Sequence, residues 1–99
     1  MKTARIYGEV EKIEDITKIN RMIRRDVRKA KTKSRLTELY NRSKYLVTLT
    51  YSPAWKKHFR GKILKARKRA MKEFEKTAKL INRRAKQLGI AKRYDVTYG

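Results

Sequence analysis

The sequence predicts a small α+β domain: a three-stranded sheet with a shorter helical segment and one long basic amphipathic helix, in the order β-α-β-α-β. Three observations lead to this prediction. Apolar and polar residues alternate at 3–13 and at 90–98. A run at 45–51 is rich in β-branched and aromatic residues and contains no charge. In 15–44 and 53–89 apolar residues recur with a helical period, which separates these segments from strands.

The three predicted strands differ in the environment that their residues indicate. The first, TARIYGEVEKI at 3–13, alternates as a half-buried strand does, and Gly8 within it suggests a bulge. The second, YLVTLTY at 45–51, has the composition of a central strand. The third, IAKRYDVTY at 90–98, alternates again. With 99 residues in total, we expect a single domain that spans 1–99.

The first helical segment has one narrow apolar side, and Asp15 is a suitable N-cap for this helix. Its apolar residues are Ile16, Ile19, Ile23, Val27 and Ala30. Its other side carries Arg21, Arg24, Arg25, Arg28 and Lys29. The apolar phase breaks after Ala30, so we expect a kink there or a new short helix, capped by Thr32 or Ser34.

The second helical segment is longer and has clear ends. Ser52 and Pro53 form a helix start, a capping hydroxyl before a proline at the first helical position, and Gly89 is a helix stop. An uninterrupted helix between them would be ~50 Å long, unless Gly61 breaks it. Its apolar stripe includes Trp55, Phe59, Ile63, Phe74, Ile81 and Leu88. Because the remaining elements are too few to cover so long a stripe, we expect a homodimer, and the stripe forms either the core of one chain or the dimer interface.

The residue types that catalysis and metal binding require are scarce. The chain has no cysteine and one histidine, His58, which excludes disulfides, thiolate metal sites and thiol nucleophiles. It has no phosphate-cradling glycine loop and no Ser/His/Asp pattern. No run approaches the ~18 apolar residues of a membrane span. We therefore expect no enzymatic activity, no metal, no cofactor and no transmembrane segment.

Charge is the feature that indicates a function. The chain has 30 Lys and Arg against nine Asp and Glu, a net charge of +21. Most of the excess lies in the two helical segments, with +8 in 15–44 and +12 in 53–89. A compact chain this basic repels itself, so the excess indicates a polyanionic partner. The sequence predicts binding to nucleic acid, double-stranded DNA more than RNA, through phosphates and with little sequence specificity.

The candidate ligands of the nucleic acid come from both helical segments. Ten cations share one side of the second segment, and eight of them are lysines. Lysine is a point charge that suits phosphates better than base edges. The first segment offers a second, arginine-rich side. The candidate nucleic-acid-binding residues are Lys62, Lys65, Lys68, Arg69, Lys72, Lys76, Lys79, Arg83, Arg24, Arg25 and Arg28.

Two other classes of function fit the same sequence. An RNA-binding or ribosome-associated protein would have the same charge and often a long basic helix. A protein-assembly or membrane-surface module would use the apolar stripe, with the cations facing anionic lipid. Tyrosines beside the predicted strands could stack on bases, although packing against the helices is their default role.

Segments such as RMIRRDVRKAKTKSR and GKILKARKRAMKEFEKTAKL are rich in Lys, Arg and Ile, in a short chain without cysteine. In size and composition the chain resembles the small basic proteins of filamentous double-stranded DNA viruses of hyperthermophilic archaea. The resemblance implies a virus-encoded protein in the host cell cytoplasm. YLVTLTY also resembles the first strand motif of rolling-circle replication initiators, but the paired histidines that those enzymes need are missing, so their activity is not carried over.

Overall fold

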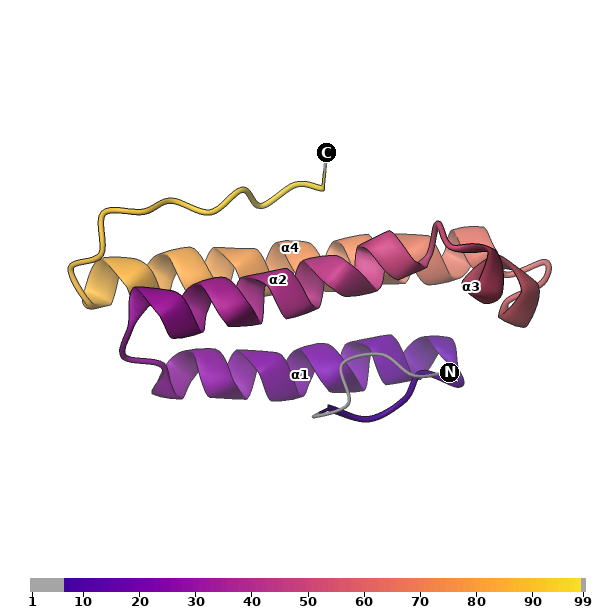
Figure 1. The fold of residues 1–99 in the computed structure, drawn as a ribbon, viewed down its shortest axis with the longest axis horizontal. Helices are drawn as coiled ribbons and strands as arrows, with labels where there is room; N and C mark the ends of the chain where they lie inside the picture. Colours follow the sequence, from indigo (N-terminus) through magenta and orange to yellow (C-terminus); the bar gives the residue numbers. More distant parts are fainter. Residues whose placement is uncertain (1–6, 99) are drawn as a thin grey trace.

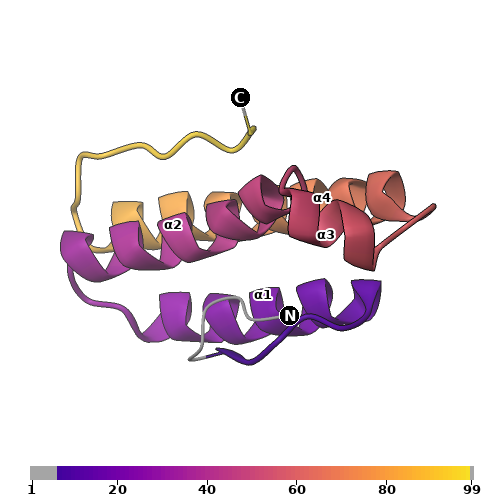
Figure 2. The same cartoon turned by 45° about the vertical axis from the view of Figure 1, so that its right-hand side comes forward.

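The computed structural model describes residues 7–98, which form a bundle of three long helices. The elements are α1 (Ile13–Lys29), α2 (Lys33–Leu49), the short α3 (Pro53–His58) and α4 (Ile63–Gln87). The three long helices lie side by side; α1 and α4 run in the same direction and α2 runs in the opposite one (Figure 1). α3 lies in the connection from α2 to α4. The segment after α4 turns back along the bundle (Figures 1 and 2).

The predicted α+β fold class is wrong, because residues 7–98 contain no sheet. The segment 45–51, predicted as the central strand, forms the last turns of α2 and the turn after it. α2 buries one stripe at helical spacing: Leu36, Leu39, Tyr40, Ser43, Leu46 and Val47. Since Ser43 is polar, the apolar residues alone do not reveal this helical period. Burial of the stripe outweighs the β propensity of the β-branched residues in this segment.

The third predicted strand is extended but pairs with no other strand among the described residues. Residues 90–98 pack on the bundle, with the Tyr94 side chain buried. The Tyr94 N–H donates to Asn82 Oδ1 at 2.6 Å, and Asn82 Nδ2 donates to the Tyr94 carbonyl at 2.8 Å. One side-chain amide thus supplies the pair of hydrogen bonds that a neighbouring strand would. The alternation marks an extended segment with one buried side, which is not a sheet strand.

Residues 3–6 of the first predicted strand lie outside the described residues. The remainder is not a strand, since residues 7–12 contain only an isolated bridge residue, Glu9, and Ile13 is the first residue of α1. Tyr7 and Val10 are buried. The Tyr7 hydroxyl donates to Asp26 Oδ2 of α1 at 2.6 Å, and the Arg42 guanidinium of α2 lies 5.7 Å from the centroid of the Tyr7 ring. The segment 7–10 therefore bridges α1 and α2.

Two predicted helix starts are confirmed. Thr32 Oγ1 accepts a hydrogen bond from the Arg35 N–H at 3.1 Å and caps α2, so a new helix does begin after the predicted break in phase. Ser52 Oγ accepts one from the Trp55 N–H at 3.3 Å, and Pro53 is the first residue of α3. These caps satisfy N–H groups that have no partner within their own helices.

Gly89 ends a helix where the sequence predicts it, and Gly61 breaks the second helical segment, which is one of the alternatives that the sequence leaves open. Gly61, with φ of +77°, lies between α3 and α4, so the long helix is broken and does not extend past the bundle. Gly89, with φ of +73°, follows α4. The N–H of Ile90 donates to the Ala85 carbonyl at 2.9 Å, which closes the C-terminal motif that a left-handed glycine allows.

The apolar stripes of the helices meet in one core, which includes the stripe predicted for a core or a dimer interface. Its buried members are Trp55, Phe59, Phe74 and Ile81, with Ile63 and Leu88 partly buried against them. A single chain therefore covers this stripe. The homodimer prediction rested on a stripe that one chain could not cover, so it is no longer supported. A membrane-surface module would lack the exposed apolar surface that it needs.

A layer of polar side chains crosses the core and links all three long helices. Asn20 Oδ1 of α1 accepts hydrogen bonds from Ser43 Oγ of α2 at 2.6 Å and from Thr77 Oγ1 of α4 at 2.9 Å. All three residues are fully buried. Because these bonds form only when the helices lie in one register, the layer favours the register that places the cations of α1 beside those of α4.

Candidate nucleic-acid interface

A three-helix bundle has three grooves between its helices, and chain segments cover two of them. The segment 7–10 lies over the groove between α1 and α2. The segment 90–98 lies over the groove between α2 and α4, where the Tyr94 hydroxyl is 2.7 Å from Thr37 Oγ1 of α2 and the Tyr94 backbone bonds to Asn82 of α4. No segment of residues 7–98 runs along the groove between α1 and α4 (Figures 1 and 2).

Polar contacts between the two helices close the base of the α1–α4 groove. Arg24 Nη1 lies 2.9 Å from Glu73 Oε1 and donates to Thr77 Oγ1 at 3.1 Å. Arg69 Nη1 donates to Thr17 Oγ1 at 3.1 Å. The Glu73 side chain is only 5% exposed. The Glu73 carboxylate at the base of the groove is therefore neutralised from within, by Arg24 and by Lys76 at 3.9 Å. Glu14 is an exposed carboxylate at the end of the groove, beside Lys65 and Arg69.

Exposed cations line both edges of this groove. On α1, Arg21 and Arg28 lie three and four residues from Arg24, so they share its side of the helix. On α4, Lys65 and Lys72 have the same relation to Arg69. We call the exposed cations on this side of the bundle the α1–α4 face: Arg21, Arg25, Arg28, Lys65, Lys72, Lys76 and Arg83. It draws on two helices that are far apart in the sequence.

Most of the predicted ligands lie on exposed helix surface. Those on the α1–α4 face are Arg25, Arg28, Lys65, Lys72, Lys76 and Arg83. Lys68 and Lys79 are exposed further round α4, and Lys62 is exposed just before its first residue. Arg24 and Arg69 differ, because both are half-buried and bond to the facing helix. Arg24, which is paired with Glu73, therefore serves the packing of α1 on α4 and is not a free phosphate ligand. Arg69 makes one bond to Thr17, through Nη1, and lines a cavity at the end of the bundle.

Sequence reasoning missed the internal roles of Glu73 and Arg67. Glu73 is in phase with the buried residues of α4, and an acidic residue in a buried phase is a signal for an internal partner. The Arg67 guanidinium lies 3.8 Å from the centroid of the Tyr51 ring, and its Nη2 donates to the Thr50 carbonyl at 3.0 Å. Such a stacked, hydrogen-bonded arginine is part of the fold.

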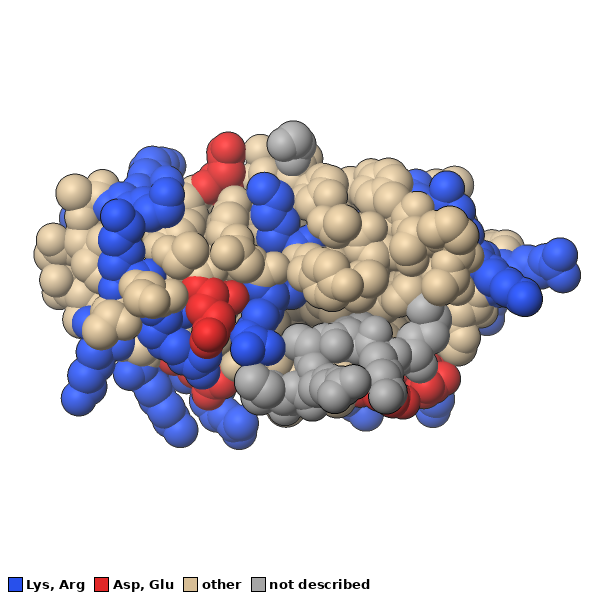
Figure 3. Space-filling model, viewed as in Figure 1, with Lys and Arg blue, Asp and Glu red and all other residues tan. Residues whose placement is uncertain are grey.

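The surface formed by α2 and the C-terminal segment has a different character. Its right-hand half in Figure 3 shows mostly uncharged side chains. Tyr45 and Tyr51 are 49% and 44% exposed, and the Tyr51 ring stacks on Tyr98 with centroids 6.1 Å apart. Burial and then the nearby Asp95 carboxylate raise the pKa of Tyr40 beneath this surface. The exposed aromatic rings and the α1–α4 face thus lie on different sides of the bundle.

Other kinds of site find little support in residues 7–98. Among them, no three His, Asp or Glu side chains gather so as to hold a metal ion, and no helix is both long and apolar enough to cross a membrane. His58 Nε2 lies 2.8 Å from the Glu11 carbonyl oxygen and 3.9 Å from its carboxylate. This histidine ties the end of α3 to the segment before α1.

The chemistry of the α1–α4 face indicates its role. The face is basic, no segment of the described residues covers it, and its cations come from two parallel helices. Comparison of the chain with protein-family models, with curated proteins and with solved structures found no match.

Proposed function

We propose that this protein binds double-stranded nucleic acid, DNA by preference, through contacts between phosphates and the α1–α4 face. One observation carries the proposal: the inter-helix groove that no segment of residues 7–98 covers is the groove with cations along both edges. Phosphate neutralisation releases counterions from the duplex, which gives affinity without base readout. A net charge of +21 supplies the long-range attraction.

The dimensions of the face suit a duplex backbone. Packed helices lie ~8–10 Å apart, so α1 and α4 present two rows of cations at about that separation. From Lys65 to Arg83 the row on α4 extends ~27 Å, at ~1.5 Å per residue. Duplex DNA carries about one charge per 1.7 Å of its axis, so phosphates are available along the whole row. Two rigid rows match a rigid partner better than a flexible strand.

The residue types of the face favour duplex DNA over the alternatives. Single-strand binders stack bases on aromatic side chains, but the exposed Tyr45 and Tyr51 belong to the other side of the bundle. Recognition of duplex RNA adds contacts to 2′-hydroxyls across the minor groove to those with phosphates. Every exposed residue of α1 is charged, and the exposed residues of α4 are charged except Leu64 and Gln87 near its ends.

Fluorescence anisotropy with a labelled 25-base-pair DNA, the matching single strand and a duplex RNA, across a salt series, tests the proposal. The test variant combines Arg25→Glu, Lys72→Glu and Arg83→Glu, three exposed positions on the α1–α4 face. We expect tightest binding to duplex DNA. Each lost phosphate contact lowers the slope of log K against log salt by about 0.9, so the variant should lose roughly three units of slope and at least 30-fold in affinity.

A matched control separates this face from net charge. Lys33→Glu, Lys92→Glu and Arg93→Glu change the charge equally at exposed positions away from the face. We expect this control to bind within threefold of the wild type at ~150 mM salt, where exposed charges more than ~8 Å apart are screened. Equal losses in both triple variants would refute the α1–α4 face as the binding surface. A stronger preference for duplex RNA would replace the DNA assignment with an RNA-binding role.

A further inference from the structure

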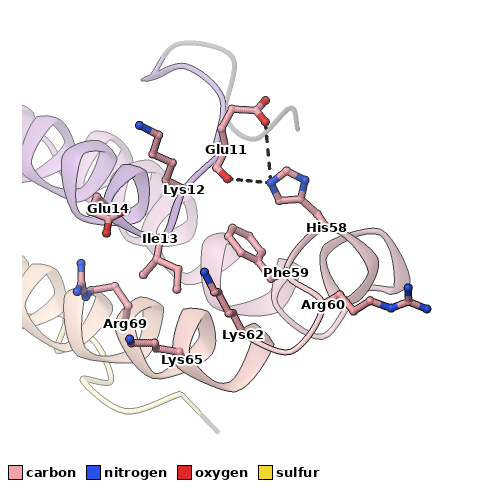
Figure 4. A pocket seen from close by; sticks show the side chains of 10 residues that line it. All are labelled: Glu11, Lys12, Ile13, Glu14, His58, Phe59, Arg60, Lys62, Lys65 and Arg69. Carbon is pink, nitrogen blue, oxygen red and sulfur yellow. Dashed lines mark hydrogen bonds and ion pairs between the residues drawn. The ribbon is translucent and has the colours of Figure 1, made fainter.

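A cavity of about 560 Å³ lies at the end of the bundle where α1 and α4 begin (Figure 4). Its walls are the segment before α1 with the first turn of α1, the end of α3 with the turn that follows, and the first two turns of α4. Five cationic side chains and two carboxylates line it. The cationic residues are Lys12, Arg60, Lys62, Lys65 and Arg69. The excess of positive charge favours an anionic ligand.

Three of the cations lie on one side of the start of α4. Lys62, Lys65 and Arg69 are three and four residues apart, so they share a side of the helix. In Figure 4 they project on the side of α4 toward Ile13, whereas Arg60 points away from them. The first turn of α4 contains no acidic residue. The three cations therefore form a cluster that a ligand with several anionic oxygens could bridge.

Apolar and aromatic groups lie beside the cationic cluster. Ile13 and Phe59 line the cavity. The His58 ring meets the Phe59 ring edge-on, with centroids 4.7 Å apart. The bond from His58 Nε2 to the Glu11 carbonyl joins the two walls next to these rings. A ligand that fits the cavity would thus combine a flat apolar part with a densely charged anionic part.

We infer that this cavity binds a nucleotide, with its phosphates on Lys62, Lys65 and Arg69 and its base near Phe59. The volume falls within the ~300–1,000 Å³ of small-molecule sites. A free nucleoside triphosphate and the phosphorylated 5′ end of a strand share this chemistry. The cavity and the α1–α4 face share Lys65, but Lys62 lines the cavity and is not part of that face, so a variant at Lys62 tests the cavity separately from duplex binding.

Isothermal titration of the full chain with ATP, and anisotropy with short 5′-phosphorylated and 5′-hydroxyl oligonucleotides, tests the inference. The site variant is Lys62→Glu, and Lys68→Glu is the matched control, since Lys68 is exposed on α4 outside the cavity. We expect Lys62→Glu to weaken ATP binding at least tenfold and Lys68→Glu less than twofold. In the wild type, ATP should shift the amide signals of 11–14 and 58–69, which is readable without any variant.

The outcomes identify the source of the phosphate. Tight ATP binding without preference for a 5′-phosphorylated strand would assign the cavity to free nucleotides. Preference for the phosphorylated strand, lost in Lys62→Glu, would assign it to strand ends. Equal weakening by both variants, or amide shifts spread along all of α4, would overturn the inference. The Arg25, Lys72 and Arg83 triple variant leaves Lys62 intact, so it should still bind ATP even where duplex binding is lost.

Discussion

Arg24 of α1 and Glu73 of α4 form an ion pair at the base of the basic groove, with Nη1 and Oε1 2.9 Å apart. The side chains are 15% and 5% exposed. Glu73 Oε2 also lies 3.4 Å from the Thr17 hydroxyl. The pair has two consequences. It links the two helices that carry the α1–α4 face, and it neutralises a carboxylate that would otherwise repel phosphates on that side.

Breaking this pair from the arginine side should destabilise the fold strongly. Arg24→Met leaves the Glu73 carboxylate buried without its cation, a change that typically costs about 3–5 kcal/mol. We expect a loss near the lower end of that range, because Lys76 Nζ lies 3.9 Å from Glu73 Oε2 and gives partial compensation. Urea unfolding followed by circular dichroism at 222 nm measures the free energy of unfolding.

Two further variants sharpen this test. Arg25→Met removes an exposed arginine one residue away and should cost under about 0.5 kcal/mol, as surface substitutions do. The double variant Arg24→Met with Glu73→Met should recover most of the loss, because apolar replacement of both partners removes the desolvated charge. A double variant no more stable than Arg24→Met alone would contradict the role given to the pair.

The buried polar layer gives a second prediction. Asn20→Ala removes the oxygen that accepts hydrogen bonds from Ser43 and Thr77. An unsatisfied buried hydroxyl costs about 1–3 kcal/mol, so we expect a loss of at least 2 kcal/mol in the free energy of unfolding. Combining Asn20→Leu, Ser43→Ala and Thr77→Val removes the three polar side chains of the layer together and should restore most of the stability, apart from the bond that Thr77 accepts from Arg24. If the triple variant stays as unstable as Asn20→Ala, the loss comes from packing and not from the unsatisfied hydroxyls.

The same polar layer explains why the fold class could not be predicted. Ser43 belongs to the buried stripe of α2, and without it the apolar residues of that helix do not show a helical period. What remains visible is YLVTLTY, with the residue types of a strand. By contrast, every buried residue of α1 except Asn20 is apolar: Ile16, Ile19, Ile23 and Val27. The apolar residues alone show the period of that helix, so it could be predicted.

The candidate site divides in the same way. The exposure of Lys65, Lys72 and Arg83 follows from the phase of one helix, so it could be predicted from the sequence. The internal role of Arg24 depends on Glu73, 49 residues further along the chain. Only the register between helices shows that pairing. The α1–α4 face as a two-helix surface therefore could not be derived from either helix alone.

The C-terminal segment should be held mainly by Tyr94. Its ring is buried, its centroid is 5.0 Å from that of Tyr40, and its backbone bonds to Asn82. Tyr94→Ala should lower the free energy of unfolding by about 3 kcal/mol, as truncation of buried aromatic residues does. Amide hydrogen exchange should show faster exchange in 90–98. Tyr98→Ala, at a half-buried position, serves as the comparison and should cost less than half as much; equal costs would contradict this account.

Stability in acid should depend on Asp15. Its Oδ2 accepts hydrogen bonds from the N–H groups of Lys12 and Glu11, each at 2.9 Å, so it caps α1 from the first turn and not from the N-cap position that the sequence predicts. These bonds hold the pKa of Asp15 below its usual range. A depressed pKa in the folded state contributes stability above the unfolded value of about 3.9, and that contribution is lost as pH falls through the folded value.

Asp15→Ala should therefore cost about 1 kcal/mol at pH 6, the usual value of such a cap, and much less at pH 2. Urea unfolding at both pH values measures the difference. Glu14→Ala removes the same charge from the same first turn, so it controls for the change in net charge and for the helix dipole, and its cost at pH 6 should be smaller. A cost for Asp15→Ala that is equal at pH 6 and pH 2 would show that the ionised carboxylate is not what stabilises the start of α1.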